Sequence, residues 1–419
     1  MKTTLRSEMF HRQPRYWSLT LGAVVGLGVC SAVIGGEPGQ PATAKPAEAE
    51  RASAVQPPTR GDLAVAIDRG LQFLLKSQNS NGWWSTPEQP AVTALVLTAF
   101  NREPTRRYRS NRPSELRQAY DFILGSAKPD GSIHRGTFIN YNTSLSLLAL
   151  ATADEPTFLP VIRAARGYLA KTQIDFGEPG KVDTEFDGGV GYGSQYQHSD
   201  LNNTLTAIEA MRWSEQMLSS KDVPPGTPAD PDLNWAAVVH FLQSCQNLPS
   251  HNPAAWVSED PRDRGGFVYY PGHSMAGGVT NPVTGKVALR SYGSISYAGL
   301  LSYLYAEVDR DDPRVKAVME WLKTNYTLDE NPAMGAQGYY YYLHLLTKAL
   351  LAARVDTLRL EGGREIRWRD EVTRKLLQLQ QPDGCWSNRE ERWWEADKNL
   401  VTAYVVLSLE MLHANPAAP

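Results

Sequence analysis

Apolar residues recur at intervals of three and four along most of the chain, a spacing that predicts helices with one buried face. One unit repeats: such a helix, then a turn with glycine followed by an aromatic residue, then a second and more apolar helix. The first unit has its turn at 78–84 and the last at 380–386. Recurrence of one unit along a chain is the pattern of a repeat architecture.

Four weaker turns lie between these two. They fall at 129–131, 187–192, 264–269 and 335–339. The turns are separated by about 45 to 80 residues, so inserted loops are expected, notably at 219–232 and 271–288.

No single helix pair can bury its own apolar face, whereas six pairs stacked in a closed ring can. The pattern therefore predicts an all-α fold over residues 61–414, an α/α toroid or closed barrel of about six helix pairs. The helix after each glycine turn is expected to form the inner wall. An open superhelix of helix pairs is the alternative.

The N-terminus is typical of a targeting sequence. An apolar run without charges, at 17–34, follows four basic residues: Lys2, Arg6, Arg12 and Arg15. Residues 1–36 are therefore interpreted as a signal peptide or a membrane anchor, and the Pro/Ala-rich stretch 37–60 as a spacer. We expect an exported protein in the periplasm or at the cell surface, with membrane anchoring through the N-terminal segment as the alternative to cleavage.

Composition narrows the functional classes. The net charge is −3, charged residues make up 21%, and no basic cluster is interleaved with aromatics, so we expect no nucleic-acid partner. The chain has three cysteines, one of them in the leader, which gives no disulfide framework. Its 11 Trp and 19 Tyr suit a large lined interior as well as an ordinary core.

The turns at 78–84 and 380–386 resemble the Gln-Trp repeat motif of squalene-hopene cyclases and their prenyltransferase relatives, which has Gln, a few residues, Gly, one residue and Trp. The resemblance covers about residues 61–413, essentially all of the chain after the spacer. It implies the α/α-toroid fold of that superfamily. It does not imply an activity, because one fold hosts many functions.

In the squalene cyclases a motif Asp-x-Asp-Asp-Thr opens an inner helix, and its middle Asp protonates the substrate. The resemblance aligns this motif with residues 200–204, where Asp200 is kept and Asn202 and Asn203 replace the two later carboxylates. An amide cannot serve as a general acid. The resemblance thus argues against the family's alkene protonation, and the alternative for Asp200 or Asn202 is capping of the helix.

Other predicted inner helices also begin with polar residues. The candidates among these residues are Asn142, Tyr292 and Lys398. In a toroid these helix starts surround the mouth of the central cavity. Together they would suit a polar ligand better than a bare hydrocarbon. Capping alone would explain most of them individually.

Four further side chains are candidates for the same cavity. His198 could orient against Asp200 or lie in a surface loop. Tyr341 and His344 share a helix face, where core packing is the alternative. Trp394 belongs to an aromatic cluster at 393–397 that could form a lid over a ligand or seal the ring between the sixth and first repeats.

Protein prenyltransferases use a zinc ion bound by an Asp, a Cys two residues later and a His in a later repeat. Asp383 and Cys385 have the first spacing, but both belong to the turn motif, and His413 is the only histidine after them. Zinc needs a third protein ligand of suitable geometry. We therefore predict no metal and no cofactor.

Two functional classes remain open at this level. The first is an exported, non-cyclising toroid that binds a small molecule or a protein in its central cavity. The second is an enzyme acting on an isoprenoid or another lipid with a relocated catalytic acid. A long apolar cavity would favour the enzyme, and a short, polar or plugged cavity would favour binding.

Overall fold

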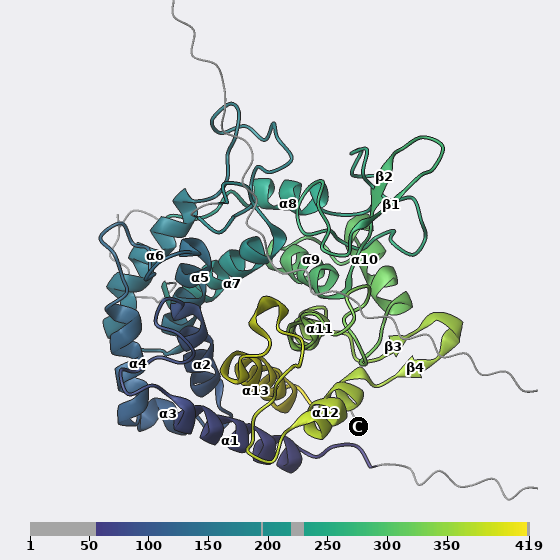
Figure 1. Ribbon diagram of the computed structural model, residues 1–419. Coiled ribbons are helices and arrows are strands. Elements are labelled where there is room, and N and C mark those ends of the chain that lie inside the picture. Colours follow the sequence, from purple (N-terminus) through teal and green to yellow (C-terminus); the bar gives the residue numbers. More distant parts are fainter. Residues whose placement is uncertain (1–55, 194–195, 219–229, 417–419) are drawn as a thin grey trace, which may run out of the picture. The chain divides into compact units, whose positions relative to one another are not determined.

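The computed structural model describes residues 56–193, 196–218 and 230–416, and twelve long helices in these residues form an outer and an inner ring (Figure 1). The outer helices are α1 (Arg60–Ser77), α4 (Ser114–Leu124), α6 (Leu159–Lys171), α8 (Trp235–Ser244), α10 (Pro313–Thr324) and α12 (Trp368–Leu379). The inner helices are α2 (Pro90–Arg102), α5 (Ile139–Thr152), α7 (Leu201–Leu218), α9 (Gly293–Tyr305), α11 (Tyr339–Ala352) and α13 (Lys398–Ala414). The inner helix of each pair follows the glycine turn, as predicted.

The inner helices close into a ring because each packs on the next. The contacts run in order from α2 through α5, α7, α9 and α11 to α13, and α13 packs on both α2 and α1. The first and sixth pairs therefore touch. This confirms the closed barrel and excludes the open superhelix.

Burial explains why the second helix of each pair is the more apolar. The outer helix α4 buries one face, with Leu116, Ala119, Tyr120 and Ile123 at helical spacing. The inner helix α5 is packed from several sides and buries nearly every residue from Asn140 to its end. A helix with one neighbour layer needs one apolar face, and a helix inside the ring needs more than one.

Glycines join neighbouring pairs at the backbone. Gly82, Gly131, Gly188, Gly265 and Gly384 have φ between 89° and 95°, which glycine adopts without steric cost. A Cβ on each would lie 2.0–2.5 Å from a carbonyl oxygen of the next outer helix. For Gly384 that oxygen belongs to α1, so the joint used between successive repeats also closes the ring.

The motif glutamine reinforces this joint. Gln78 Nε2 donates to the carbonyl of its own turn glycine at 3.0 Å and to the carbonyl of Glu115 in α4 at 2.8 Å. Gln380 does the same at the ring closure, with the carbonyl of Ala66 in α1 at 2.9 Å. The same pair of bonds is made by Gln173 and Gln246.

The fifth turn departs from this arrangement. Gly335 has φ 61°, and a Cβ there would meet no atom within 4 Å. Side chains make the joint instead: Asp329 pairs with Lys375 of α12 at 2.8 Å, and the Tyr326 hydroxyl donates to Glu371 of the same helix at 3.3 Å. The fifth repeat therefore lacks the backbone contact that the other five turns make.

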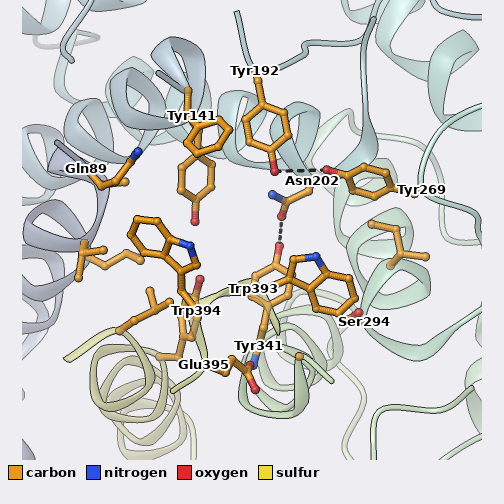
Figure 2. Close-up of a pocket in the computed structure, with 18 of the residues that line it drawn as sticks. Gln89, Tyr141, Tyr192, Asn202, Tyr269, Ser294, Tyr341, Trp393, Trp394 and Glu395 are labelled. Atoms are coloured by element: carbon orange, nitrogen blue, oxygen red, sulfur yellow. Dashed lines mark hydrogen bonds between the residues drawn. The ribbon is translucent and has the colours of Figure 1, made fainter. Parts of the chain in front are cut away.

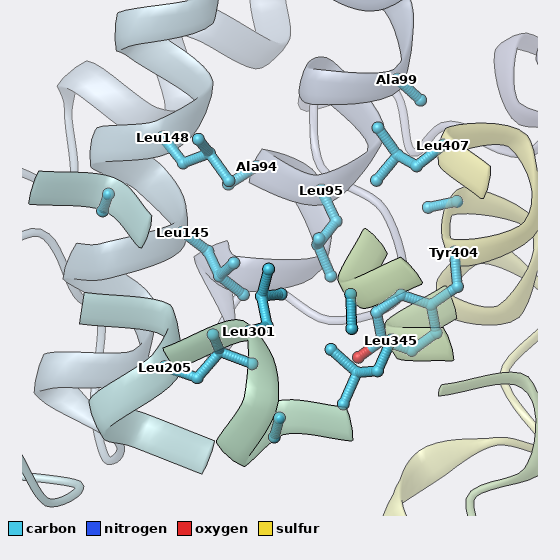
Figure 3. Packing of buried hydrophobic residues seen from close by; sticks show 14 of the residues in the cluster. Ala94, Leu95, Ala99, Leu145, Leu148, Leu205, Leu301, Leu345, Tyr404 and Leu407 are labelled. Carbon is cyan, nitrogen blue, oxygen red and sulfur yellow. The ribbon is translucent and has the colours of Figure 1, made fainter. Parts of the chain in front are cut away.

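Side chains fill the centre of the ring (Figure 3). Four leucines from different inner helices meet there, each at most 5% exposed: Leu95, Leu145, Leu205 and Leu345. Tyr404 of α13 lies beside them. The void that remains has a volume of about 30 Å³. The ring therefore has no open channel through its middle.

The connections carry shorter elements. Within the expected insertion at 271–288, β1 (Gly278–Thr280) and β2 (Val287–Leu289) form an antiparallel hairpin, and β3 (Leu358–Arg359) pairs with β4 (Glu365–Ile366) before α12. Helical turns occur at α3 (Arg107–Ser110), η1 (Pro156–Phe158) and η2 (Glu361–Gly363).

Several expectations fall outside the described residues: the leader at 1–36, most of the spacer at 37–60 and most of the insertion at 219–232. Among the helices that the structure does describe, none combines the length and apolar character needed to cross a membrane.

The glycine joint can be tested at the ring closure. We expect Gly384→Ala to lower the free energy of unfolding by at least about 3 kcal/mol, because the new Cβ combines a positive φ with a backbone clash. Gly335→Ala is the matched control, with a positive φ and no neighbour, and should cost about 1 kcal/mol. Urea unfolding of both variants measures the difference. Equal losses would contradict a structural role for the contact.

Candidate functional site

A cavity of about 240 Å³ lies at the end of the ring where the inner helices begin (Figure 2). Each inner helix, or the residues just before it, contributes to the wall. Six tyrosines line it: Tyr141, Tyr192, Tyr269, Tyr292, Tyr341 and Tyr404. Phe138, Trp393 and Trp394 add three more rings. The helix starts therefore surround a common space, and nine of the nineteen described residues in its wall are aromatic.

The repeated turn sets which residue of each helix faces this space. In five repeats the backbone N–H two residues after the glycine donates to a hydroxyl on the inner helix, as Val190 does to Thr204 at 2.9 Å. The other hydroxyls are those of Thr93, Thr143, Ser296 and Thr402. The residue two before each hydroxyl lines the cavity: Ala91, Tyr141, Asn202, Ser294 and Leu400. The turn thus fixes the rotation of the helix.

Asn202 lies at this inward position of α7 and takes part in a hydrogen-bonded group. The Tyr341 hydroxyl of α11 donates to Asn202 Oδ1, so this bond spans the cavity between two inner helices that are separated by α9 (Figure 2). The hydroxyls of Tyr192 and Tyr269 lie 3.4 Å apart beside it. Burial raises the pKa of all six cavity tyrosines above the ordinary value, so their hydroxyls stay protonated.

Two tryptophans form the rim. Trp393 and Trp394 belong to the turn η3 (Arg392–Trp394) before α13, and they are 40% and 45% exposed. Both have positive φ, 58° and 67°. Such a conformation costs roughly 1–3 kcal/mol for a bulky residue and persists only where the surroundings hold it. Gly338 leaves room for the Trp393 ring, which a Cβ there would approach to 2.9 Å.

Glu395 fixes this rim to the ring. Its buried carboxylate accepts the backbone N–H of Tyr341 at 2.7 Å and that of Tyr340 at 3.3 Å, at the start of α11. Asn388 Nδ2 donates to the same carboxylate at 2.7 Å. Burial raises the pKa of Glu395 above its ordinary value, although these N–H donors oppose the shift. Glu395 therefore caps α11 from a loop more than fifty residues away in sequence.

Asp200 does not line the cavity. It is fully buried, and its Oδ1 accepts the backbone N–H of Asn203 at 2.8 Å, which is the capping bond at the start of α7. Its Oδ2 accepts from Asn203 Nδ2 at 2.6 Å. Burial raises the pKa of Asp200 to about 6, against the effect of these hydrogen bonds. The structure thus places Asp200 and Asn203 in a cap behind the cavity wall.

Asn142 is also a structural group. Its Oδ1 accepts the backbone N–H of Ala91 at 2.9 Å, and its Nδ2 donates to Gln89 Oε1 at 3.1 Å, so it ties the starts of α5 and α2 together. It is fully buried and does not line the cavity. The expectation that it faces a ligand is not what the structure shows, because the side chain is rotated toward α2.

Three other candidates lie away from the cavity. The His198 ring packs against Tyr270 at a tilt of 43°, with ring centroids 4.3 Å apart, in the loop before α7. Lys398 is half exposed and pairs with Asp383 at 3.4 Å, so the expected cation does not enter the cavity. His344 lines the small deep void and lies 3.1 Å from Ser408 Oγ. Burial lowers the pKa of His344 well below its ordinary value, so the ring is neutral.

Tyr292, Tyr341, Asn202 and Trp394 are the sequence candidates that the structure brings together at the cavity. Gln89, Tyr192, Tyr269 and Glu395 were not singled out from the sequence, although they share the wall. Aligning the repeats on the inner-helix hydroxyl would have identified the inward position. Nothing local in the sequence identifies Glu395, because its partner lies on another repeat.

The turn at 380–386 has a structural role at the ring closure. Gly384 and Gln380 are engaged in the ring closure, and the buried Cys385 Sγ lies 3.4 Å from Gln381 Oε1. In the part of the chain that the structure describes, no group of three His, Cys, Asp or Glu side chains could hold a metal ion.

Comparison with known proteins gives matches only at the level of structure. No protein-family model and no curated protein sequence matches the chain. The type II terpene cyclase MstE from Scytonema is 15% identical with a TM-score of 0.50, over 85% of this chain and 99% of the cyclase. Protein geranylgeranyltransferase-I from Candida albicans is 12% identical with a TM-score of 0.50, over 84% of this chain and 92% of the transferase.

The fold is the α/α toroid of terpenoid cyclases and protein prenyltransferases. A family 76 glycoside hydrolase from a bovine Bacteroides thetaiotaomicron strain is similar to the same extent, with 12% identity and a TM-score of 0.51 over 84% of this chain and 78% of the hydrolase. Three different chemistries thus share the toroid. Function must be argued from the cavity.

The burial of Asp200 predicts a pH dependence of stability. The pKa of Asp200 is about 6 in the folded protein, and its reference value is 3.8. The protonated carboxyl therefore contributes stability to the folded protein that is fully present below about pH 4 and is lost as pH rises to about 6. The loss amounts to about 3 kcal/mol. Asp200→Asn should remove this part of the slope in urea unfolding between pH 4 and pH 7.

Two further variants control this measurement. Asp200→Ala should be less stable than Asp200→Asn by about 1 kcal/mol at pH 7, because it has no acceptor for the cap. The exposed Asp311→Asn should not flatten the slope. A slope unchanged in Asp200→Asn would place Asp200 in contact with solvent.

Proposed function

We propose that this chain is an exported α/α-toroid protein that binds a small ligand in the cavity at the start of its inner helices, without acid-initiated cyclisation. The observation that carries the proposal is the cavity itself, which is open at a tryptophan rim and ends on the leucines that fill the ring. Its volume of about 240 Å³ is near the lower limit of small-molecule sites. Export rests on the basic and apolar pattern of residues 1–36.

The chemistry of α7 supports a non-cyclising role. The inward position of this helix carries Asn202, and an amide has no acidic proton to give to an alkene. The neighbouring carboxyl of Asp200 is engaged by Asn203 in the helix cap. A proton donor at the place that the cyclase motif would use is therefore lacking among the described residues.

A lipid-modifying enzyme with a relocated acid is the second candidate, and Glu395 is the group that favours it. Glu395 is a buried carboxyl on the cavity wall, and burial raises its pKa. However, both carboxylate oxygens accept hydrogen bonds, one from the backbone of Tyr341 and one from Asn388. These donors stabilise the ionised form. Binding is therefore the better-supported function.

Blocking the cavity tests ligand binding. Leu400 lies on the α13 wall, and Leu400→Trp should fill much of the space, so fragments that bind the wild-type protein should lose their signals in ligand-observed NMR. Val65→Trp is the control, because Val65 is 62% exposed on the outer helix α1. Thermal unfolding shows whether both variants fold. Equal binding by Leu400→Trp would mean that the fragments bind elsewhere.

The absence of cyclase chemistry is tested directly. The purified protein, incubated with squalene, should give no cyclic triterpene above a boiled control in gas chromatography with mass spectrometry, because Asn202 stands where the acid is needed. A cyclic product would overturn the non-cyclising assignment. If that product disappeared in Glu395→Gln but not in Asp200→Asn, Glu395 would be the relocated acid.

A further inference from the structure

The cavity presents aromatic rings rather than free hydrogen-bonding groups, and the inference drawn from this rests on the proposed binding function. Of the nineteen described residues that line it, nine are aromatic. Several of its polar groups are paired with one another or with the wall behind them. Asn202 Oδ1 accepts from Tyr341, and Ser294 Oγ accepts from Asn331 Nδ2 at 3.2 Å.

This pairing argues against a sugar or another ligand with many hydroxyls. Such a ligand would need several free donors and acceptors, and Gln89 Oε1 is already bound by Asn142. The carboxylate of Glu395 is likewise bound on both oxygens. The faces of the rings therefore remain as the main surface that a ligand can use. These faces carry the negative end of the ring quadrupole.

The charge of the wall has one sign. Glu395 is the single acidic residue among the described lining residues, and none of them is Lys, Arg or His. Asp200 adds a second carboxyl just behind the wall, close enough to act electrostatically on Tyr192 and Tyr269. The expected cation Lys398 points elsewhere. An anion in this cavity would meet no Lys, Arg or His on the described wall, with Arg392 outside the wall as the cation acting on Tyr292, whereas a cation would meet ring faces and a carboxylate.

The rim already holds one cation against an aromatic ring. The Arg392 guanidinium lies 4.5 Å from the centroid of the Trp393 ring. Trp393 and Trp394 are held in positive-φ conformations that place them over the cavity mouth (Figure 2). Conformations of this cost are retained where a surrounding structure enforces them, and here Glu395 and Gly338 do so.

We propose that the cavity binds a small organic cation, a quaternary ammonium or protonated amine group, which sits among the tyrosines under Trp393 and Trp394 with Glu395 as its counter-charge. A cation of this class needs few directional hydrogen bonds. Its binding becomes more favourable with every aromatic ring face that replaces water around the charged group. The ligand is a metabolite or a lipid headgroup that carries such a cationic group. Free choline is the probe, because it contains the quaternary ammonium group that both sources share.

The test compares choline with dimethylbutanol, its neutral isostere in which a carbon replaces the nitrogen. In isothermal titration calorimetry with the wild-type protein, choline should bind at least about tenfold more tightly than dimethylbutanol. Trp394→Leu and Glu395→Gln should each lose this preference while keeping measurable binding of the neutral probe. Two variants are used because Glu395 also caps α11, and thermal unfolding identifies a variant that fails to fold.

Trp235→Leu is the matched control. Trp235 lies on the outer helix α8 under the Arg212 guanidinium, 4.0 Å from its ring centroid, and does not line the cavity. Its substitution should leave the preference for choline unchanged. A preference that survived in both Trp394→Leu and Glu395→Gln would show that choline binds elsewhere and would overturn the proposal.

The remaining outcomes separate this inference from the proposed function. Equal or tighter binding of dimethylbutanol would overturn the cation inference and leave the cavity as a site for neutral ligands. Absence of binding by both probes would also overturn it. The fragment experiment with Leu400→Trp then decides independently whether the cavity binds ligands at all. A vesicle containing phosphatidylcholine, compared with free choline, distinguishes a headgroup from a soluble metabolite.

Discussion

The contact on which the ring depends is the approach of a turn glycine to the backbone of the next outer helix. At Gly82 and at Gly384 the same geometry appears, once between adjacent repeats and once between the last repeat and the first. A side chain at either position would separate two helix pairs by the width of a methyl group. Small equal errors in angle add up around a ring, so a joint fixed by backbone contact rather than by flexible side chains favours closure over an open superhelix.

The same joint determines the site. Because the N–H after the turn is held by a hydroxyl of the inner helix, the helix starts at a fixed rotation, and the residue two before the hydroxyl points inward. At α7 that residue is Asn202 and at α13 it is Leu400. Evolution can change the chemistry of such a cavity by changing one residue per repeat without disturbing the ring.

The sequence predicts the parts of this structure that depend on local chemistry. The repeats, the glycine turns, the order of outer and inner helices and the closed barrel follow from periodicity and from residues such as Gln78 and Gly82. The sequence also offers the capping role of Asp200, as one of two interpretations of the polar start of this helix. Apolar periodicity does not predict the rotation of each helix, which becomes predictable only when the repeats are aligned on the inner-helix hydroxyl. Asn142 therefore faces α2, and Lys398 pairs with Asp383 of the last turn, so neither faces the cavity.

Contacts between distant repeats are the second feature of the structure that local sequence patterns cannot predict. Glu395 and Tyr341 are separated by 54 positions, and no spacing in the sequence connects them. The leucines that fill the centre of the ring also depend on contacts between distant repeats. Leu95, Leu205 and Leu345 look like ordinary helix-core leucines in the sequence, and only the closed ring brings them together. Whether the cavity is long or short therefore cannot be predicted from the helices one at a time.

The fifth repeat is the one in which the contacts at the turn also involve the rim of the cavity. Its turn lacks the glycine contact, and Gly338 instead accommodates Trp393 while Glu395 caps α11. The side-chain pairs with α12 replace the backbone joint there, and the rim holds the start of α11. A group that interacts with Trp394 or Glu395 would act on the start of α11 and, through Tyr341, on Asn202 across the cavity. The irregular repeat is therefore the place where the cavity rim contacts the start of an inner helix directly.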